Sequence, residues 1–378
     1  PEQYDQVLLV VCCALGAVLS ARFIRSMLGF RYPSSVPNNA FPGLYSFYVR
    51  FRVLVLVVFV LGVLAVAVSN NLFGFYQRGL VARTLLPFGL NGVYTWLLSF
   101  GLAACSAILL RFEFELSRDR YWIVVAISLL ETLASNVSML SRGMVLNAGS
   151  LAYGGASLFS RTETYVRSRL MVFVAVLFCV FFVASVLAVN TMRAGLFYVD
   201  ADPAEASTVA EVVSTQTAPL FLDRWVGIEG VMSVVGASHA GWDLFEAALN
   251  EQFDKEKNSF YDETFVDSSY DNTRADGRHF VSLPGYIAFL FYPASYLFLF
   301  AAIFMFSVLA YAFEYFVYRV GGRNLVLCAL IAQVIAFRYT SFGYVPLQSY
   351  MLFGSITLNI LIFYCVDQCM RRWYKPLL

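Results

Sequence analysis

A long polar segment, Asn190 to Pro284, interrupts a chain that is otherwise strongly apolar, and it limits what this chain can fold into. It holds 16 of the 25 Asp and Glu residues but only six of the 26 Lys and Arg residues. A segment of this length and polarity cannot cross a bilayer, because its backbone groups would lack hydrogen-bond partners in hydrocarbon. We therefore expect it to form a domain on one membrane face.

The rest of the composition indicates a polytopic, all-α membrane protein. Hydrophobic residues make up 60% of the chain and charged residues 13%, whereas charged residues reach about 25% in soluble domains. The basic residues are dispersed rather than clustered, so we expect no nucleic-acid partner.

Apolar runs of about 17 to 25 residues are long enough to cross a bilayer as helices. We predict about nine to ten spans, the tenth preceding Pro1, because the chain does not begin with methionine and its first apolar run is short. Residues 1–190 then form N-terminal spans, 191–284 a polar domain with short helices, and 285–378 three C-terminal spans. The Gly-rich fifth run suits either close helix packing or a broken, re-entrant segment. The expected spans lie near 6–22, 53–69, 87–110, 121–140, 143–160, 170–190, 285–313, 324–341 and 348–369.

The basic residues beside the spans predict the orientation, since cytoplasmic loops are enriched in Lys and Arg. Alternate loops carry most of the basic residues, whereas the short loops between them, on the other side of the membrane, carry only Arg78, Arg83, Arg142 and Arg338. The polar segment is thus expected to face outward, with the C-terminus inside. The basic loops hold Arg22, Arg25, Arg31, Arg50 and Arg52, then Arg111, Arg118 and Arg120, then Arg161, Arg167 and Arg169, then Arg319 and Arg323, and finally Arg371, Arg372 and Lys375.

Within the polar segment, Trp242, Phe245, Leu249 and Phe253 recur at helical spacing with acidic residues between them. This pattern predicts an amphipathic helix. It either lies along the membrane interface or is buried inside the outer domain.

Four arginines are expected at the outer face, where their charge does not serve to set topology: Arg142, Arg224, Arg278 and Arg338. Any one of them can reach lipid headgroups by extending its side chain. Several on separate elements favour a functional site, because ionised groups near hydrocarbon are costly. Arginine also grips phosphate through a planar, bidentate fork.

The polar segment contains the motif Arg224-Trp225-Val226-Gly227-Ile228-Glu229-Gly230. It joins a guanidinium, an indole and a carboxylate, with glycines that permit close backbone approach to a ligand. An indole face can stack on a sugar ring, so the motif suits a saccharide joined to an anionic group. Glu229 and His279 are the candidate general bases.

Nothing in the sequence favours a metal or an organic cofactor. Asp267, Asp271 and Asp276 miss the spacing of a calcium loop. The seven cysteines lie in apolar stretches without a zinc-type pairing, as expected for small buried residues. We expect metal-independent chemistry without cofactors.

Taken together, the many-span bundle, one large late outer loop, the Ser141-Arg142-Gly143 junction and the Arg224 motif resemble the Wzy-type O-antigen and exopolysaccharide polymerases. The likeness covers most of the chain in layout, whereas in residues it depends on the junction and the motif.

This resemblance implies a GT-C-like, metal-independent glycosyltransferase on the periplasmic face of a bacterial inner membrane. Its substrates would be undecaprenyl-pyrophosphate-linked oligosaccharides, and its leaving group undecaprenyl pyrophosphate. Membrane lipids and a Wzz-type chain-length regulator are the further expected partners. The expected catalytic residues are Glu229, His279 and Arg224, and the expected pyrophosphate- and sugar-binding residues are Arg142, Arg224, Trp225, Arg278, Arg338 and Tyr339.

Three alternatives remain at this point. An O-antigen ligase shares the layout and the donor but transfers the glycan to lipid A core. A lipid-linked sugar transporter or flippase would need a charged cavity open to both sides. A non-catalytic subunit of polysaccharide assembly would tolerate the loss of its outer arginines.

Overall fold

The computed structural model describes residues 2–27, 29–39, 41–141, 145–162, 168–197, 228–237, 239–266, 279 and 281–373. All the helices and turns discussed below belong to these residues. The expected all-α class is confirmed, since every long element is a helix.

Seven helical segments of the described chain are long and apolar enough to cross a membrane. Two of them are composite, because short 3₁₀ or π turns continue directly into an α-helix. The protein is therefore a multi-pass helical membrane protein. The seven segments are α1 (Glu2–Met27); α2 (Pro42–Phe73); η1 (Pro87–Gly89), α3 (Asn91–Trp96), η2 (Leu97–Gly101) and α4 (Leu102–Leu116) together; α5 (Tyr121–Ser138); α7 (Ser168–Phe197); α13 (Tyr296–Val320); and η5 (Pro346–Ser349) with α15 (Tyr350–Trp373).

The prediction of nine to ten spans exceeds these seven, because two expected spans form shorter helices. They are α6 (Val145–Phe159), with 15 residues, and α14 (Leu325–Thr340), with 16. The two pack so closely that a Cβ on Gly154 would lie 2.6 Å from Cα of Val326. The described part of the Gly-rich run thus forms one continuous helix that packs closely, which is the first of its two expected roles.

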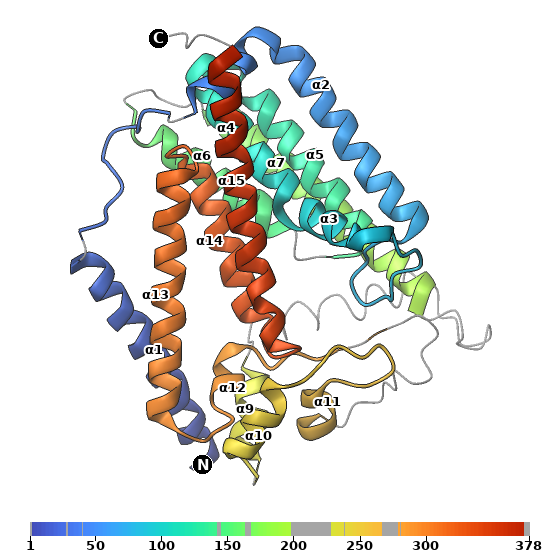
Figure 1. The fold of residues 1–378 in the computed structure, drawn as a ribbon, viewed down its shortest axis with the longest axis vertical. Coiled ribbons are helices and arrows are strands. Elements are labelled where there is room, and N and C mark those ends of the chain that lie inside the picture. The colour runs from blue at the N-terminus through green and yellow to red at the C-terminus, as the bar shows by residue number, and fades with distance from the viewer. Residues whose placement is uncertain are drawn as a thin grey trace.

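The helices run back and forth between two ends of the bundle (Figure 1). One end holds the start of α2, the ends of α4 and α15, and the described C-terminal residues. The other end holds the short helices α9 (Glu229–Gly236), α10 (Trp242–Leu249), α11 (Phe260–Phe265) and α12 (Tyr286–Leu290), called here the α9–α12 assembly.

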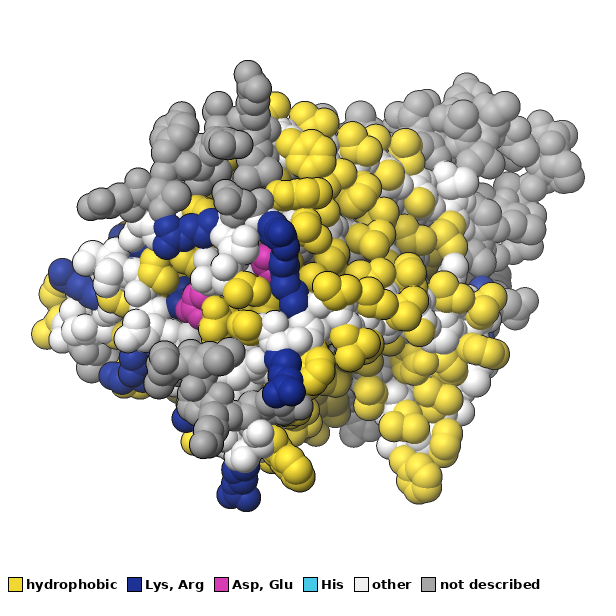
Figure 2. Space-filling view, turned by 90° about the horizontal axis from the view of Figure 1, so that it is seen from above, with side chains coloured by type: hydrophobic (Ala, Val, Ile, Leu, Met, Phe, Trp, Pro, Cys, Tyr) yellow, Lys and Arg dark blue, Asp and Glu magenta, His cyan; other side chains and the backbone are white. Residues whose placement is uncertain are grey.

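Buried carboxylates organise the end at which α2 begins. Asp367 of α15 is fully buried, and its Oδ1 accepts hydrogen bonds from the backbone N–H groups of Gly43 (2.9 Å) and Leu44 (3.0 Å). Its Oδ2 pairs with Arg371 Nε at 2.6 Å. This carboxylate satisfies two donors that a helix start leaves unpaired. Seen from this end, basic side chains gather on one part of the face and apolar ones cover the other (Figure 2).

The α9–α12 assembly shares a hydrophobic core with the bundle. Val10 of α1, Val234 of α9, Phe289 of α12 and Ile303 of α13 belong to one buried cluster. The described part of the polar segment therefore rests on α1 and α13.

The expected amphipathic helix forms in part, as α10, which ends at Leu249, so that Phe253 lies outside it. Its aromatic face packs on the ends of α12 and α13, since the Phe245 ring lies 5.1 Å from that of Phe298 and 5.5 Å from that of Phe289. Trp242 contacts Phe298 at 5.0 Å. Phe245 is thus half-buried within the protein, whereas Trp242 is 57% exposed at the surface.

Candidate functional site

A tight turn after α2 builds the first part of the candidate site. Asn70, fully buried near the end of α2, donates from Nδ2 to the Tyr76 carbonyl (2.9 Å) and to the Ser138 carbonyl (2.9 Å). Its Oδ1 accepts from Tyr76 N–H at 2.8 Å. Gly74 ends the helix in the left-handed conformation, at φ +63°. One amide side chain thus fixes the 74–79 turn against the end of α5.

Arg78 lies on this turn, against the end of α14. Its guanidinium carbon lies 5.0 Å from the centre of the Phe337 ring, and its Nε is buried without a hydrogen-bond partner among the described residues. Arg338, the residue after Phe337, donates from Nη2 to Ser349 Oγ at 3.0 Å. Phe337, the ring that Arg78 contacts, directly precedes Arg338, so both arginines lie at the end of α14.

Arg193, near the end of α7, joins this region from a third element. It donates from Nε to the Leu140 carbonyl (3.0 Å) and from Nη2 to the Arg78 carbonyl (3.2 Å). Leu140, two residues after the end of α5, lies in the left-handed region, at φ +53°. Arg78, Arg193 and Arg338 are called here the arginine cluster.

Arg78 and Arg338 have no carboxylate within ion-pair distance in the part of the chain that the structure describes. Both side chains are half-buried. Because like charges that share a partly dehydrated site repel, such a pair favours the binding of an anion between or beside them.

His279 is attached to the same turn. Its backbone N–H donates to the Gly79 carbonyl at 3.1 Å, and its Nε2 is hydrogen-bonded to the Tyr344 hydroxyl at 2.9 Å. Burial lowers the pKa of His279, against the opposing effect of the nearby Asp254 and Asp262. Burial also raises the pKa of Tyr344, to about 12. Near neutral pH this position therefore holds an uncharged imidazole beside an uncharged phenol.

Glu229 begins α9, where its charge suits the positive end of a helix dipole. The contacts of this residue stay within the α9–α12 assembly: its carbonyl accepts from Ser233 Oγ at 2.9 Å, and its charge acts on Tyr261. None of its described contacts joins it to Arg78 or Arg338.

Gly230, the last residue of the Arg224 motif, makes the close backbone approach expected of its glycines. The partner is the Pro284 carbonyl, into which a Cβ at position 230 would project. The motif's final glycine therefore lets α9 dock on the chain segment that leads to α12.

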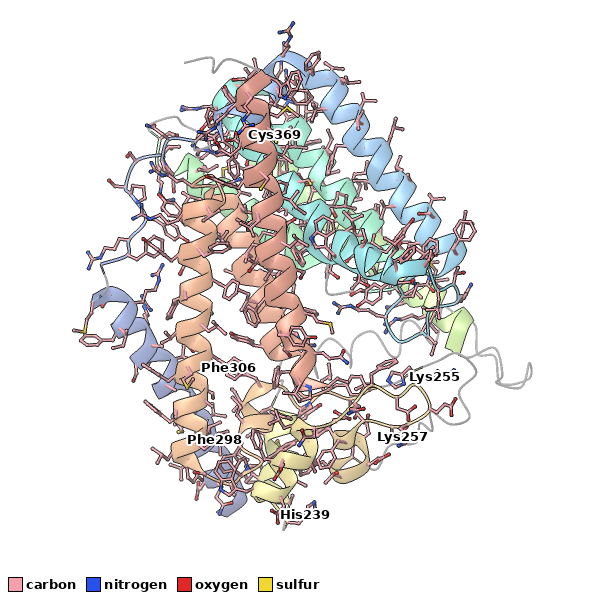
Figure 3. All side chains as sticks on the ribbon, in the orientation of Figure 1. His239, Lys255, Lys257, Phe298, Phe306 and Cys369 are labelled. Carbon is pink, nitrogen blue, oxygen red and sulfur yellow. The ribbon has the colours of Figure 1, made fainter. Side chains whose placement is uncertain are left out.

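Tyr339 takes part in helix packing. Its hydroxyl donates to the Phe306 carbonyl of α13 at 3.0 Å, and its ring stacks on Tyr286 at 5.5 Å. Phe306 lies part-way along α13 and Phe298 nearer the α9–α12 assembly (Figure 3). The expected role of Tyr339 in binding substrate stays a prediction.

Two acids of this region, the half-buried Glu251 and the buried Asp262, hold backbone groups in place. Glu251 accepts from Phe260 N–H (2.6 Å) and from Val345 N–H (3.2 Å). Asp262 accepts from Ser259 Oγ at 2.6 Å and from the backbone N–H of Ser282 at 3.0 Å. The lysines that the structure describes, Lys255 and Lys257, lie in the loop between α10 and α11 (Figure 3).

The other expected site residues, Arg142, Arg224, Trp225 and Arg278, lie outside the described residues. Of the remainder, the structure brings His279 and Arg338 to the turn that carries Arg78. From the sequence, Arg78 could be placed only in a short loop, and Arg193 was not among the expected site residues. The sequence feature that could have indicated the turn carrying Arg78 is Asn70, a polar residue that ends an apolar run four positions before Gly74.

Within the described ranges, no group of three or more His, Cys, Asp or Glu side chains is placed to hold a metal ion. Comparisons of the chain with protein-family models, with curated proteins and with solved structures found no match.

Proposed function

We propose that this protein is a membrane glycosyltransferase that polymerises undecaprenyl-pyrophosphate-linked oligosaccharide repeat units, as the Wzy-type resemblance implies. The growing glycan leaves its lipid pyrophosphate and joins a sugar hydroxyl of the next lipid-linked unit. The observation that carries the proposal is the pair Arg78 and Arg338, two half-buried guanidinium groups at one site without a described carboxylate partner.

Loss of a pyrophosphate from an anomeric carbon builds negative charge on the departing oxygen. Fixed cations in a partly dehydrated site stabilise that charge better than water does, because they need no reorganisation as it develops. Arg78 and Arg338 supply such cations. Arg142, Arg224 and Arg278 are proposed to add to them, and Trp225 and Tyr339 to contact sugar.

In the reaction, the acceptor oxygen forms a bond to the anomeric carbon while the bond from that carbon to the pyrophosphate oxygen breaks. The acceptor's proton passes to a general base, and undecaprenyl pyrophosphate leaves with the bonding electrons. We assign the base role to His279 rather than Glu229, because its backbone is bound to Gly79, the residue after Arg78. Its lowered pKa keeps it able to accept a proton near pH 7.

An excess of acid in the polar segment would repel two pyrophosphates if the carboxylates faced the site. Glu251 and Asp262 instead accept hydrogen bonds from neighbouring backbone N–H groups. Both carboxylates are thus engaged by backbone donors.

The test replaces Arg78, Arg142, Arg224 and Arg338 singly by Ala in cells that lack the natural copy, and examines the polysaccharide ladder. Loss of long chains with single-repeat product retained supports a polymerase. Loss of all capped product supports an O-antigen ligase, and an unchanged ladder contradicts both and favours a non-catalytic subunit. Arg83→Ala is the matched control, since Arg83 is an exposed arginine of the same loop.

A further inference from the structure

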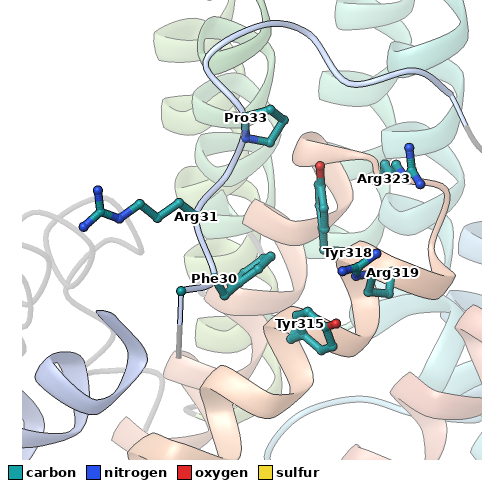
Figure 4. A pocket seen from close by; sticks show the side chains of 8 residues that line it. Phe30, Arg31, Pro33, Tyr315, Tyr318, Arg319 and Arg323 are labelled. Carbon is teal, nitrogen blue, oxygen red and sulfur yellow. The ribbon is translucent and has the colours of Figure 1, made fainter. Parts of the chain in front are cut away.

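A cavity of about 400 Å³ lies between the chain that follows α1 and the end of α13, and none of its lining residues belongs to the arginine cluster. Tyr315, Tyr318 and Arg319 line it from α13, and Arg323 from the turn after α13 (Figure 4). Phe30 and Pro33 form the opposite wall, and the Arg31 guanidinium extends away from it. We name it the Arg319 cavity.

The lining of the Arg319 cavity carries positive charge and aromatic rings, with no acidic residue. The nearest acid on α13, Glu314, is already engaged: Arg25 binds both of its carboxylate oxygens, at 2.7 and 3.1 Å, and Tyr32 donates to it at 2.7 Å. The side chains of Arg319 and Arg323 have no hydrogen-bond or ion-pair partner in the described chain. An anion entering the cavity therefore meets cations that no carboxylate neutralises.

The turn that bears Arg323 is tightly built. A Cβ on Gly322 would lie 2.6 Å from the Phe41 ring, and Arg323 itself adopts φ +52°, which is unfavourable for a residue with a side chain. Its N–H donates to the Tyr318 carbonyl at 3.1 Å. The next residue, Asn324, caps α14 through Val326 N–H. Packing on both sides thus holds Arg323 in a strained conformation at the cavity edge, as is common at binding sites.

The aromatic wall is also preorganised. Phe30 packs edge-on against Tyr315 at 5.2 Å and against Tyr32 at 5.3 Å, and Tyr32 packs on Tyr318 at 5.2 Å. The Arg319 guanidinium lies 5.2 Å from the centre of the Tyr315 ring. This stacking fixes the plane of the guanidinium and leaves its edge N–H groups available to a ligand.

One exposed stripe of α13 leads to the cavity. Its residues recur every three or four positions, are apolar along the helix and end on Arg319; they are Leu297, Ala301, Met305, Leu309, Ala312, Tyr315 and Arg319. At 1.5 Å per residue the stripe is roughly 33 Å long, which is close to the thickness of a bilayer core. An acyl chain can therefore lie along the stripe while the group attached to it reaches the cavity.

We propose that the Arg319 cavity binds the phosphate headgroup of an anionic phospholipid, whose acyl chains lie along the exposed stripe of α13. A free phosphate shares the headgroup chemistry but leaves the stripe unused. The proposal does not depend on the glycosyltransferase assignment, because it concerns different residues at a different place.

The test measures lipid binding to the purified full chain in detergent by native mass spectrometry. We expect phosphatidylglycerol to bind, and the R319A/R323A variant to bind it at least about tenfold more weakly. Phosphatidylcholine is expected to bind weakly to both proteins. Inorganic phosphate should displace phosphatidylglycerol only at far higher concentration.

Two further variants keep the result interpretable. R319K/R323K retains both charges and should recover most of the binding, which shows that a loss in the Ala variant is not misfolding. Arg372→Ala removes an exposed arginine of α15 outside the cavity and should change nothing. Unaltered binding by R319A/R323A, equal binding of phosphatidylcholine, or displacement by phosphate at the concentration of the lipid would each overturn the proposal.

Discussion

His279 Nε2 and the Tyr344 hydroxyl lie 2.9 Å apart. Their hydrogen bond joins the C-terminal part of the polar segment to the loop after α14. The imidazole is held neutral there, since burial lowers its pKa. Protonation would leave a charged ring in a site that disfavours charge. This relationship makes the stability of the region depend on pH.

Acidification is expected to destabilise the folded protein through His279. A base whose pKa is lower in the folded than in the unfolded state adds stability above its unfolded pKa, near 6.5, and loses it as the pH falls through the folded value. Thermal unfolding in detergent between pH 8 and pH 5 should therefore show a fall in melting temperature that His279→Gln reduces. An identical pH profile in the variant would contradict this account.

Asn70→Ala is expected to be strongly destabilising. The change leaves the part-buried N–H and carbonyl of Tyr76 and the buried carbonyl of Ser138 without their partner, at a cost of about 1–3 kcal/mol for each buried group that stays unpaired. The measurement is the melting temperature in detergent. Asn71→Ala is the control, because Asn71 is the next residue and is exposed.

The same substitution also tests the candidate site. Because Asn70 fixes the turn that bears Arg78, its loss should shorten the polysaccharide ladder even where the protein still reaches the membrane. A destabilised Asn70→Ala protein with an unchanged ladder would mean that the position of Arg78 does not matter for function.

Gly230→Ala is expected to disturb the docking of α9. The added Cβ would project into the Pro284 carbonyl, and neither backbone can move away freely, since Gly343 also lies against Pro284. We expect a loss of about 1–3 kcal/mol from overpacking, seen as faster hydrogen exchange in α9. Gly236→Ala in the same helix meets nothing within 4 Å and should be neutral or slightly stabilising. Equal exchange rates in the two variants would contradict the docking role.

The helical class and most helix positions could be predicted from the sequence, because long apolar runs permit few alternatives in a membrane. Length alone did not predict α6 and α14 as short helices. Their bounds were expected from hydropathy alone. The close packing of Gly154 against Val326 depends on which helices become neighbours, and hydropathy does not give that information.

The candidate site shows the same division. Arg338 and His279 could be selected by residue type and by their place beside a span. Arg78 could not be selected in this way. Its place in the candidate site depends on the turn that Asn70 builds and on the contact of Arg78 with the Phe337 ring. A single sequence records neither long-range contact.

Arg338→Lys and Arg78→Lys are expected to lower polymerisation although both keep the charge. Lysine lacks the planar fork that binds two phosphate oxygens, and at position 78 it cannot reproduce the stacking on Phe337. We expect a partial loss for each Lys variant and a loss of roughly 10²-fold or more for each Ala variant, measured as the rate of chain extension with lipid-linked repeat units in membrane vesicles. If the Lys and Ala variants extend chains as fast as the unaltered protein, the two guanidinium groups do not bind the pyrophosphate.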